Sequence, residues 1–134
     1  MNHIKRSMLA SIETKIKIAL DQEFLLELER IANYMIACLR SKKKILIAGN
    51  GGSAADAQHF AAELAGQFIH KRKGLPVMAL TTNASITTAI GNDFGYEYVF
   101  SRQVEGFGHQ GDIFVAISTS GNSLNLVHAI NAAK

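Results

Sequence analysis

The 134-residue sequence has one proline, one cysteine and no tryptophan, and it contains no long run of apolar residues. With a single proline and no repetitive segments, it lacks the linkers and low-complexity tails that separate domains. A lone cysteine excludes an internal disulfide and fits a reducing compartment. No stretch reaches the roughly 18 apolar residues of a membrane span, and the apolar stretch near the N-terminus is too short for a signal peptide. These absences predict a cytoplasmic protein with no membrane contact.

The composition predicts one globular domain over residues 1–134. Hydrophobic residues make up 48% of the chain and charged residues 19%, a balance typical of a folded domain with a real core. The net charge of +3 comes with two basic clusters, 42–44 and 70–73. We interpret both clusters as solvated surface that also steers anionic substrates. No nucleic-acid-binding motif accompanies them, so we expect no nucleic-acid partner.

The first 40 residues form a helical segment by their pattern. Residues 8–20 and 21–40 carry apolar residues at a period of 3.6, which predicts two helices. Asp21 either caps the second helix or interrupts one long helix. Both helices carry broad apolar stripes, and packing against another copy of the chain would cover them.

Strands and helices alternate over residues 41–134. Apolar runs predict strands at 45–48, 76–80 and 112–117, with helices at 53–68, 85–90, 96–104 and from 122 onward, and loops at 91–96 and 106–111. Alternating elements predict an α/β fold with a parallel sheet and helices on both faces. Ligands of such sheets bind at the carboxyl ends of the strands. Three loops therefore become candidates: 49–53, 81–85 and 118–123.

The loop Gly49-Asn50-Gly51-Gly52-Ser53 joins the first strand to a helix. Glycines permit positive φ and a close approach of the backbone to a ligand, and the following helix offers free N–H groups and a positive dipole end. Ser53 and Asp56 match a capping pattern for that helix. We interpret the loop as an anion site; the alternative is a plain helix start without a ligand.

The loop 118–123 combines hydroxyls with a glycine. Ser118, Thr119, Ser120 and Ser123 flank Gly121 between a strand and a helix. Hydroxyls and backbone N–H groups suit a phosphate, whose oxygens accept several hydrogen bonds. The alternative is an ordinary helix cap, but a cap needs only one such residue.

A nucleotide site is excluded. Residues 49–54 match the pattern G-x-G-x-x-A, but a dinucleotide site also needs an acidic residue at the end of the next strand. No Asp or Glu occurs between Glu63 and Asp93. The phosphate-loop motif of nucleotide hydrolases is absent as well.

Asp56, His59 and Glu63 share one face of the helix after the glycine loop. His59 and Glu63 could hold a metal together, transfer a proton, or form a solvated pair. Their place just after an anion loop favours a functional role. By contrast, Cys38 reads as a core residue, and His109 and His128 as surface residues.

Several separated segments resemble the phosphoheptose isomerases, the sedoheptulose 7-phosphate isomerases of the SIS (sugar isomerase) domain family. These segments are 48–64, 89–95, 100–105 and 117–123. The resemblance implies a homotetramer of flavodoxin-like subunits, a parallel sheet flanked by helices and preceded by N-terminal helices. It also implies conversion of sedoheptulose 7-phosphate to D-glycero-D-manno-heptose 7-phosphate, the first step toward bacterial heptoses for lipopolysaccharide or capsule.

By position, the resemblance assigns roles to individual residues. It implies that Ser118, Thr119, Ser120 and Ser123 bind the phosphate. It implies sugar contacts for Asn50, Gly51, Gly52, Ser53, Asn92 and Asp93. His59 and Glu63 would be zinc ligands, and Glu63 would also bind substrate and transfer a proton.

The sequence departs from the family in two places. Family members continue past position 134 with further strands and a helix, which carry two more zinc ligands and the partner acid–base His. We therefore expect a truncated chain with impaired activity. Gln67 stands where relatives often have an Arg near a neighbouring subunit's substrate. The alternative function is a non-catalytic SIS-fold protein that binds a sugar phosphate or regulates a partner, as in replication-initiator-associating proteins.

Overall fold

The computed structural model describes residues 2–134, which divide into two compact units, 2–36 and 37–134. The first unit holds α1 (His3–Leu20) and most of α2 (Gln22–Arg40). The second unit holds an α/β arrangement of three strands and the remaining helices. The α/β class predicted from the alternating pattern is confirmed.

Side-chain caps define both helices of the first unit. Asn2 accepts a hydrogen bond from the Ile4 N–H at 3.0 Å, so α1 begins at His3, five residues earlier than predicted. Asp21 accepts from the Phe24 N–H at 3.0 Å, which makes it the cap of α2. Large apolar side chains of this unit stay exposed along both helices, although no described helix is apolar enough to cross a bilayer.

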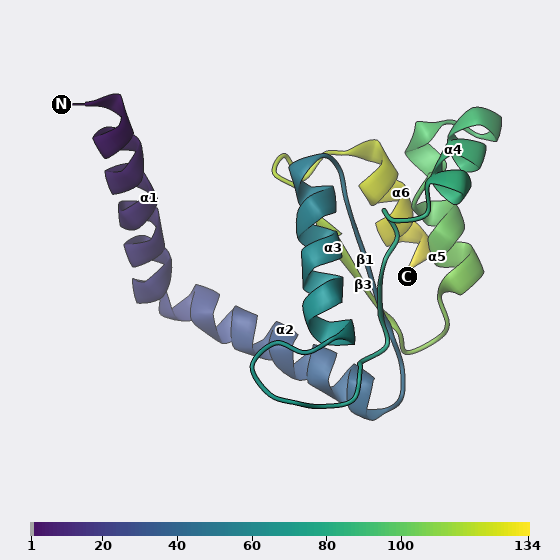
Figure 1. Ribbon diagram of the computed structural model, residues 1–134, viewed down its shortest axis with the longest axis horizontal. Coiled ribbons are helices and arrows are strands. Elements are labelled where there is room, and N and C mark those ends of the chain that lie inside the picture. Colours follow the sequence, from purple (N-terminus) through teal and green to yellow (C-terminus); the bar gives the residue numbers. More distant parts are fainter. Residues whose placement is uncertain (1) are drawn as a thin grey trace. The chain divides into compact units, whose positions relative to one another are not determined.

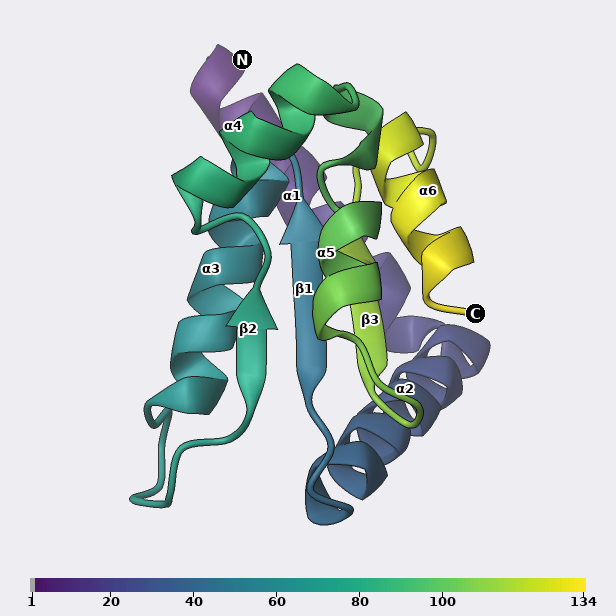
Figure 2. The same cartoon turned by 90° about the vertical axis from the view of Figure 1, so that its right-hand side faces the viewer.

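The sheet orders its strands β2-β1-β3, all parallel. Its strands are β1 (Ile45–Gly49), β2 (Val77–Ala79) and β3 (Ile113–Ile117). Figure 2 shows β1 between its two neighbours with all three strands pointing the same way. Gly49 pairs with Ile117 at the carboxyl end, so the chain leaves β1 and β3 at the same level.

Helices cover both faces of the sheet, as predicted. The helix α3 (Gly52–Ala65) packs on β1 and β2, while α5 (Ser101–Phe107) and α6 (Leu124–Ala132) lie on the other side (Figure 1). Leu46 and Ala48 of β1 share one face of the sheet because they are two residues apart in the strand, and this face packs against α5 and α6. Their core partners are Leu80, Val99, Phe100, Val104, Leu126 and Ala129.

The predicted elements between residues 85 and 104 are wrong in two places. The helix α4 runs over Ala84–Asp93, into the predicted loop 91–96, because the Phe94 N–H still bonds to the Ile90 carbonyl at 2.9 Å. The predicted helix 96–104 is a 3-10 turn, η1 (Tyr96–Tyr98), followed by α5. The predicted loop began at Gly91, but glycine only weakens a helix that packing supports.

At the amino edge of the sheet, Asp112 joins the segments that lead into β1 and β3. Its carboxylate accepts from the Lys44 backbone N–H at 2.9 Å and the His109 backbone N–H at 2.8 Å, and it pairs with the Lys44 ammonium. Burial by itself raises the pKa of the Asp112 carboxyl, but these donors outweigh that effect and hold the pKa below its ordinary value of 3.8. Asp112 thereby ties the start of β3 to the start of β1.

Cys38 belongs to the same region and is buried. Its thiol donates to the Lys44 carbonyl at 3.4 Å. Burial, with a smaller contribution from the Asp112 charge, raises the pKa of the Cys38 thiol. The group therefore stays protonated and is a poor nucleophile, which agrees with the predicted core role.

We expect Asp112→Asn to lower the free energy of unfolding by about 1–3 kcal/mol at neutral pH, because a buried charged acceptor of three donors is lost. Since the folded-state pKa is depressed, the contribution is complete above the ordinary Asp value of 3.8 and disappears as pH falls below it. Urea unfolding of both proteins across this range measures the difference. A gap between the two proteins that stays constant into acid would contradict the assignment.

Candidate functional site

Two loops predicted to bind a ligand lie against one cavity of about 210 Å³ at the carboxyl edge of the sheet. Its lining comes from the glycine turn after β1 and the hydroxyl loop 118–123 after β3. The lining residues are Asn50, Ser53, Ile117, Ser118, Thr119, Ser120 and Ser123. Of the predicted site residues, six therefore share this cavity, and no carboxylate is among its lining residues.

The glycine turn needs glycine at two positions for different reasons. A Cβ on Gly49 would lie 2.4 Å from the Ser53 carbonyl oxygen, so the turn can fold back tightly only without a side chain there. Gly51 has φ of +55°, a conformation costly for other residues. These two constraints bring the start of α3 up to the end of β1.

The predicted Ser53 cap with Asp56 is wrong. The helix α3 begins at Gly52, with Gly51 as N-cap and no side-chain capping bond. Ser53 therefore lies inside the first turn, where its N–H bonds to the Asn50 carbonyl at 3.0 Å. Its side chain lines the cavity instead.

The hydroxyl loop is shaped by bonds from its own backbone. Ser118 Oγ accepts from the Gly121 N–H at 3.1 Å, and Ser120 Oγ accepts from the Asn122 N–H at 3.2 Å. Ser123 Oγ lies 3.4 Å from Ser118 Oγ. A hydroxyl that accepts an N–H keeps its hydrogen for another partner, so this loop can still donate to an anion.

Helix ends add to the positive character of the cavity. Ser123 is the N-cap residue of α6, yet its side chain makes no capping bond. This disfavours the reading of the loop as an ordinary helix cap. Both α3 and α6 begin beside the cavity, and each helix start presents N–H groups and the positive end of a dipole. Hydroxyl donors, two helix starts and no lining carboxylate suit a phosphate.

Asn92 and Asp93 lie at the end of α4 and are not among the lining residues. They are exposed and bond to each other, Asn92 Nδ2 to Asp93 Oδ1 at 2.8 Å. The neighbouring Tyr96 connects this segment to the glycine turn through a bond from its OH to Asn50 Oδ1 at 3.3 Å. The sequence reasoning missed Tyr96.

His59 and Glu63 lie side by side on α3, with His59 Nε2 3.7 Å from Glu63 Oε1. An imidazole nitrogen and a carboxylate oxygen are suitable zinc ligands. Within residues 2–134, no third His, Cys, Asp or Glu joins them to form a metal-binding group. The pair fits two positions of a zinc site, and the described residues do not complete it.

Glu63 is also distant from the cavity along its own helix. It follows Ser53 by ten residues in α3, which corresponds to about 15 Å at roughly 1.5 Å per residue. The structure thus places the hydroxyl loop and Asn50 together, but leaves His59 and Glu63 apart from them.

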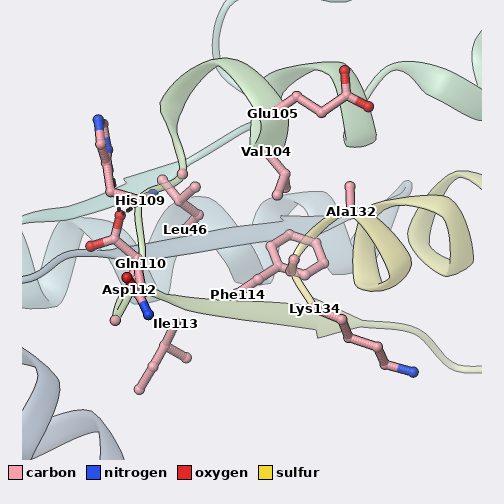
Figure 3. A pocket seen from close by; sticks show the side chains of 13 residues that line it. Leu46, Val104, Glu105, His109, Gln110, Asp112, Ile113, Phe114, Ala132 and Lys134 are labelled. Atoms are coloured by element: carbon pink, nitrogen blue, oxygen red, sulfur yellow. Dashed lines mark hydrogen bonds and ion pairs between the residues drawn. The ribbon is translucent and has the colours of Figure 1, made fainter.

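A larger cavity, about 410 Å³, lies at the opposite edge of the sheet (Figure 3). Leu46, Val104 and Phe114 form its apolar part, with Asp112 and His109 beside them. Its most buried charge, Asp112, already has three hydrogen-bond donors. Since ligands of parallel sheets bind at the carboxyl edge, the smaller cavity is the candidate site.

Comparison with known proteins agrees with this geometry. The family model of the SIS domain matches residues 9–134. The phosphoheptose isomerase of Aneurinibacillus thermoaerophilus is 50% identical over 133 residues, which cover 99% of this chain and 67% of that protein. The phosphoheptose isomerase of Sulfurimonas denitrificans is 50% identical over 98% of this chain and 68% of its own length.

Solved structures give the same result. A phosphoheptose isomerase from Francisella tularensis superposes with a TM-score of 0.91 at 36% identity, over 97% of this chain and 67% of that one. The phosphoheptose isomerase from Neisseria gonorrhoeae superposes with a TM-score of 0.82 at 45% identity, over 97% and 68% of the two chains. The chain spans about two thirds of the length of these relatives. It belongs to the SIS domain family, in the group of the phosphoheptose isomerases.

Proposed function

We propose that this chain binds sedoheptulose 7-phosphate and serves its isomerisation to D-glycero-D-manno-heptose 7-phosphate. The cavity shared by the glycine turn and the hydroxyl loop carries the proposal. Ser118, Ser120 and Ser123 would donate their hydroxyl hydrogens to the phosphate, and the glycine turn would contact the sugar. Similarity to proteins named phosphoheptose isomerase supports the choice of substrate.

The chemistry requires one proton to change carbon atoms. A base removes a proton from C1 of the ketose, and an enediol forms as the carbonyl oxygen at C2 takes up a proton. Return of a proton to C2 and loss of the O1 proton give the aldose. Glu63, half-exposed on α3, is the proposed base. Binding of the phosphate away from the reacting carbons provides orientation.

We propose zinc as the cofactor, with His59 and Glu63 as two of its ligands. Bound there, zinc would polarise the carbonyl oxygen of the sugar. The pair is suitably close, at 3.7 Å, and His59 is largely exposed, so an ion can reach it. Within residues 2–134, no group of three or more His, Cys, Asp or Glu side chains could hold a metal ion, so this pair needs further ligands.

A second copy of the chain is part of the proposal. Because Glu63 lies about 15 Å along α3 from Ser53, at roughly 1.5 Å per residue, one copy does not place both groups on the same sugar. A neighbouring copy in a homotetramer would bring its Glu63 to the cavity. Association would also cover apolar side chains that are exposed along α1 and α2, such as Ile12, Ile16 and Leu28.

We further propose a cytoplasmic role in making bacterial heptoses for lipopolysaccharide or capsule. The incomplete set of metal ligands within residues 2–134 favours one alternative, a non-catalytic protein that binds a sugar phosphate and regulates a partner. The two functions differ in one measurement. Purified wild-type protein that binds sedoheptulose 7-phosphate without converting it supports the alternative.

We expect Ser120→Ala and Ser123→Ala each to weaken binding of sedoheptulose 7-phosphate about tenfold or more, because a hydrogen bond to a charged group contributes roughly 1.5–3 kcal/mol. Isothermal titration calorimetry measures the affinity. Ser41→Ala, at an exposed serine near the amino edge, is the control and should bind like the wild type. Unchanged affinity in both loop variants would show that this loop does not bind the phosphate.

We expect Glu63→Gln to abolish turnover of sedoheptulose 7-phosphate while leaving its binding largely intact, since the amide keeps the size but cannot accept the proton. A coupled assay for the aldose product and calorimetry separate the two effects, and metal analysis of the same preparations reports zinc content. Glu105→Gln changes an exposed carboxylate on α5 and serves as control. Full activity of Glu63→Gln would exclude Glu63 from the mechanism.

Mixing a variant with weakened phosphate binding and a variant without the proposed base tests the shared site. When Ser120→Ala/Ser123→Ala and Glu63→Gln subunits are denatured together and refolded, some sites receive intact loops from one copy and Glu63 from another. We expect the mixture to be clearly more active than either variant refolded alone. No recovery in mixed tetramers, verified by differently tagged subunits, would show that each copy builds its own site.

A further inference from the structure

The side chains of Asn50 and Asn125 form a reciprocal pair. Asn50 Nδ2 donates to Asn125 Oδ1 at 2.9 Å, and Asn125 Nδ2 donates back to Asn50 Oδ1 at 2.9 Å. Asn50 lies in the glycine turn, and Asn125 is the second residue of α6. The pair therefore joins the loop after β1 to the helix that follows the hydroxyl loop.

Asn125 is far more buried than its position suggests. It is only 4% exposed, although it lies in the first turn of a helix beside a polar loop. A buried amide without partners is costly, and two reciprocal bonds satisfy half of the hydrogen-bonding groups on each side chain. Leu126 and Ala129 of the same helix are in the hydrophobic core, so their packing fixes the position of Asn125.

The pair leaves Asn50 little capacity for a ligand. Its Oδ1 accepts from Asn125 Nδ2 and also from the Tyr96 OH at 3.3 Å, which uses both lone pairs. One N–H of Nδ2 remains. Asn50 can thus give a substrate one donor, but it cannot accept from a sugar hydroxyl unless the pair opens.

Tyr96 is itself positioned by α6. It opens η1, whose third residue, Tyr98, places its ring 4.9 Å from the ring of His128 on α6. The glycine turn is therefore linked to α6 directly through Asn125 and indirectly through η1. Both links hold the turn at one distance from the hydroxyl loop.

We propose that Asn125 is a positioning residue of the site. With Asn50 it forms an amide clasp, meaning the reciprocal Asn50–Asn125 pair, that sets the separation between the glycine turn and the hydroxyl loop. The clasp matters for a ligand that touches both loops at once, such as a sugar phosphate. It matters little for a ligand held by the hydroxyl loop alone. The identity of the sugar phosphate rests on the proposed function.

Two probes separate these cases. In Asn125→Leu, which keeps the number and branching of the side-chain heavy atoms and removes both bonds, we expect the affinity for sedoheptulose 7-phosphate to fall about tenfold, since the interaction of two coupled groups is lost. The affinity for inorganic phosphate should change less than about twofold because the hydroxyls remain. Calorimetry on the wild type and the variant gives the ratio of the two affinities. An unchanged ratio would overturn the proposal.

A double-mutant cycle adds a readout that a merely structural role would not produce. If the clasp is the shared unit, Asn50→Ala/Asn125→Leu should bind the sugar phosphate no more than about twofold more weakly than the worse single variant. Additive losses would contradict the clasp. Asp112→Asn, at the opposite edge of the sheet, controls for general destabilisation and should leave the affinity ratio unchanged.

Two further outcomes are distinguishable. If the Asn125 variants do not fold, Tyr96→Phe at an exposed position removes one bond to Asn50. The ratio of the two affinities should then shift about two- to threefold in the same direction, and no shift would count against the clasp.

If wild-type protein does not bind sedoheptulose 7-phosphate at all, the proposed function fails. Thermal unfolding of the four proteins in the cycle then still decides whether Asn50 and Asn125 are coupled.

Discussion

The register of β1 with β3 is the constraint on which the site depends. Gly49 pairs with Ile117 as the last residues of the two strands. Asn50 and Ser118 therefore start their loops at the same level and on neighbouring strands. A shift of the register by one residue would turn every side chain of β3 to the other face and would separate the loops. The cavity exists because two strand ends coincide.

The two edges of the sheet use their polar groups in opposite ways. At the amino edge, the Asp112 carboxylate accepts hydrogen bonds from Lys44 and His109, which leaves it little capacity to bind a ligand. At the carboxyl edge, the Ser118 and Ser120 hydroxyls accept from the backbone, and a hydroxyl that accepts an N–H can still donate. The amides of Asn50 and Asn125 pair with each other at this edge. The amino edge thus uses its polar groups for stability, whereas the carboxyl edge has the hydroxyl donors that the proposed function requires.

Much of the fold could be predicted from the sequence, because buried strands and amphipathic helices have different periods. Local contacts decided the errors. Ser53 has the chemistry of a helix cap, but the tight turn at Gly49 makes Gly51 the N-cap of α3, two residues earlier. Gly91 suggested a loop, yet α4 continues to Asp93. Such details depend on neighbours in space, which a pattern along the chain does not contain.

Residue types and their spacing along the chain are enough to identify the available chemistry. They indicate glycines where the backbone must turn, hydroxyls after the third strand, and a His–Glu pair one helical turn apart. Which of these groups lie close together in space depends on the folded chain. It brought Asn50 to Asn125 across 75 positions of the chain, and it left Glu63 far from the cavity that Ser53 lines. The reason is that strand pairing and helix packing, and not proximity in the chain, set distances between loops.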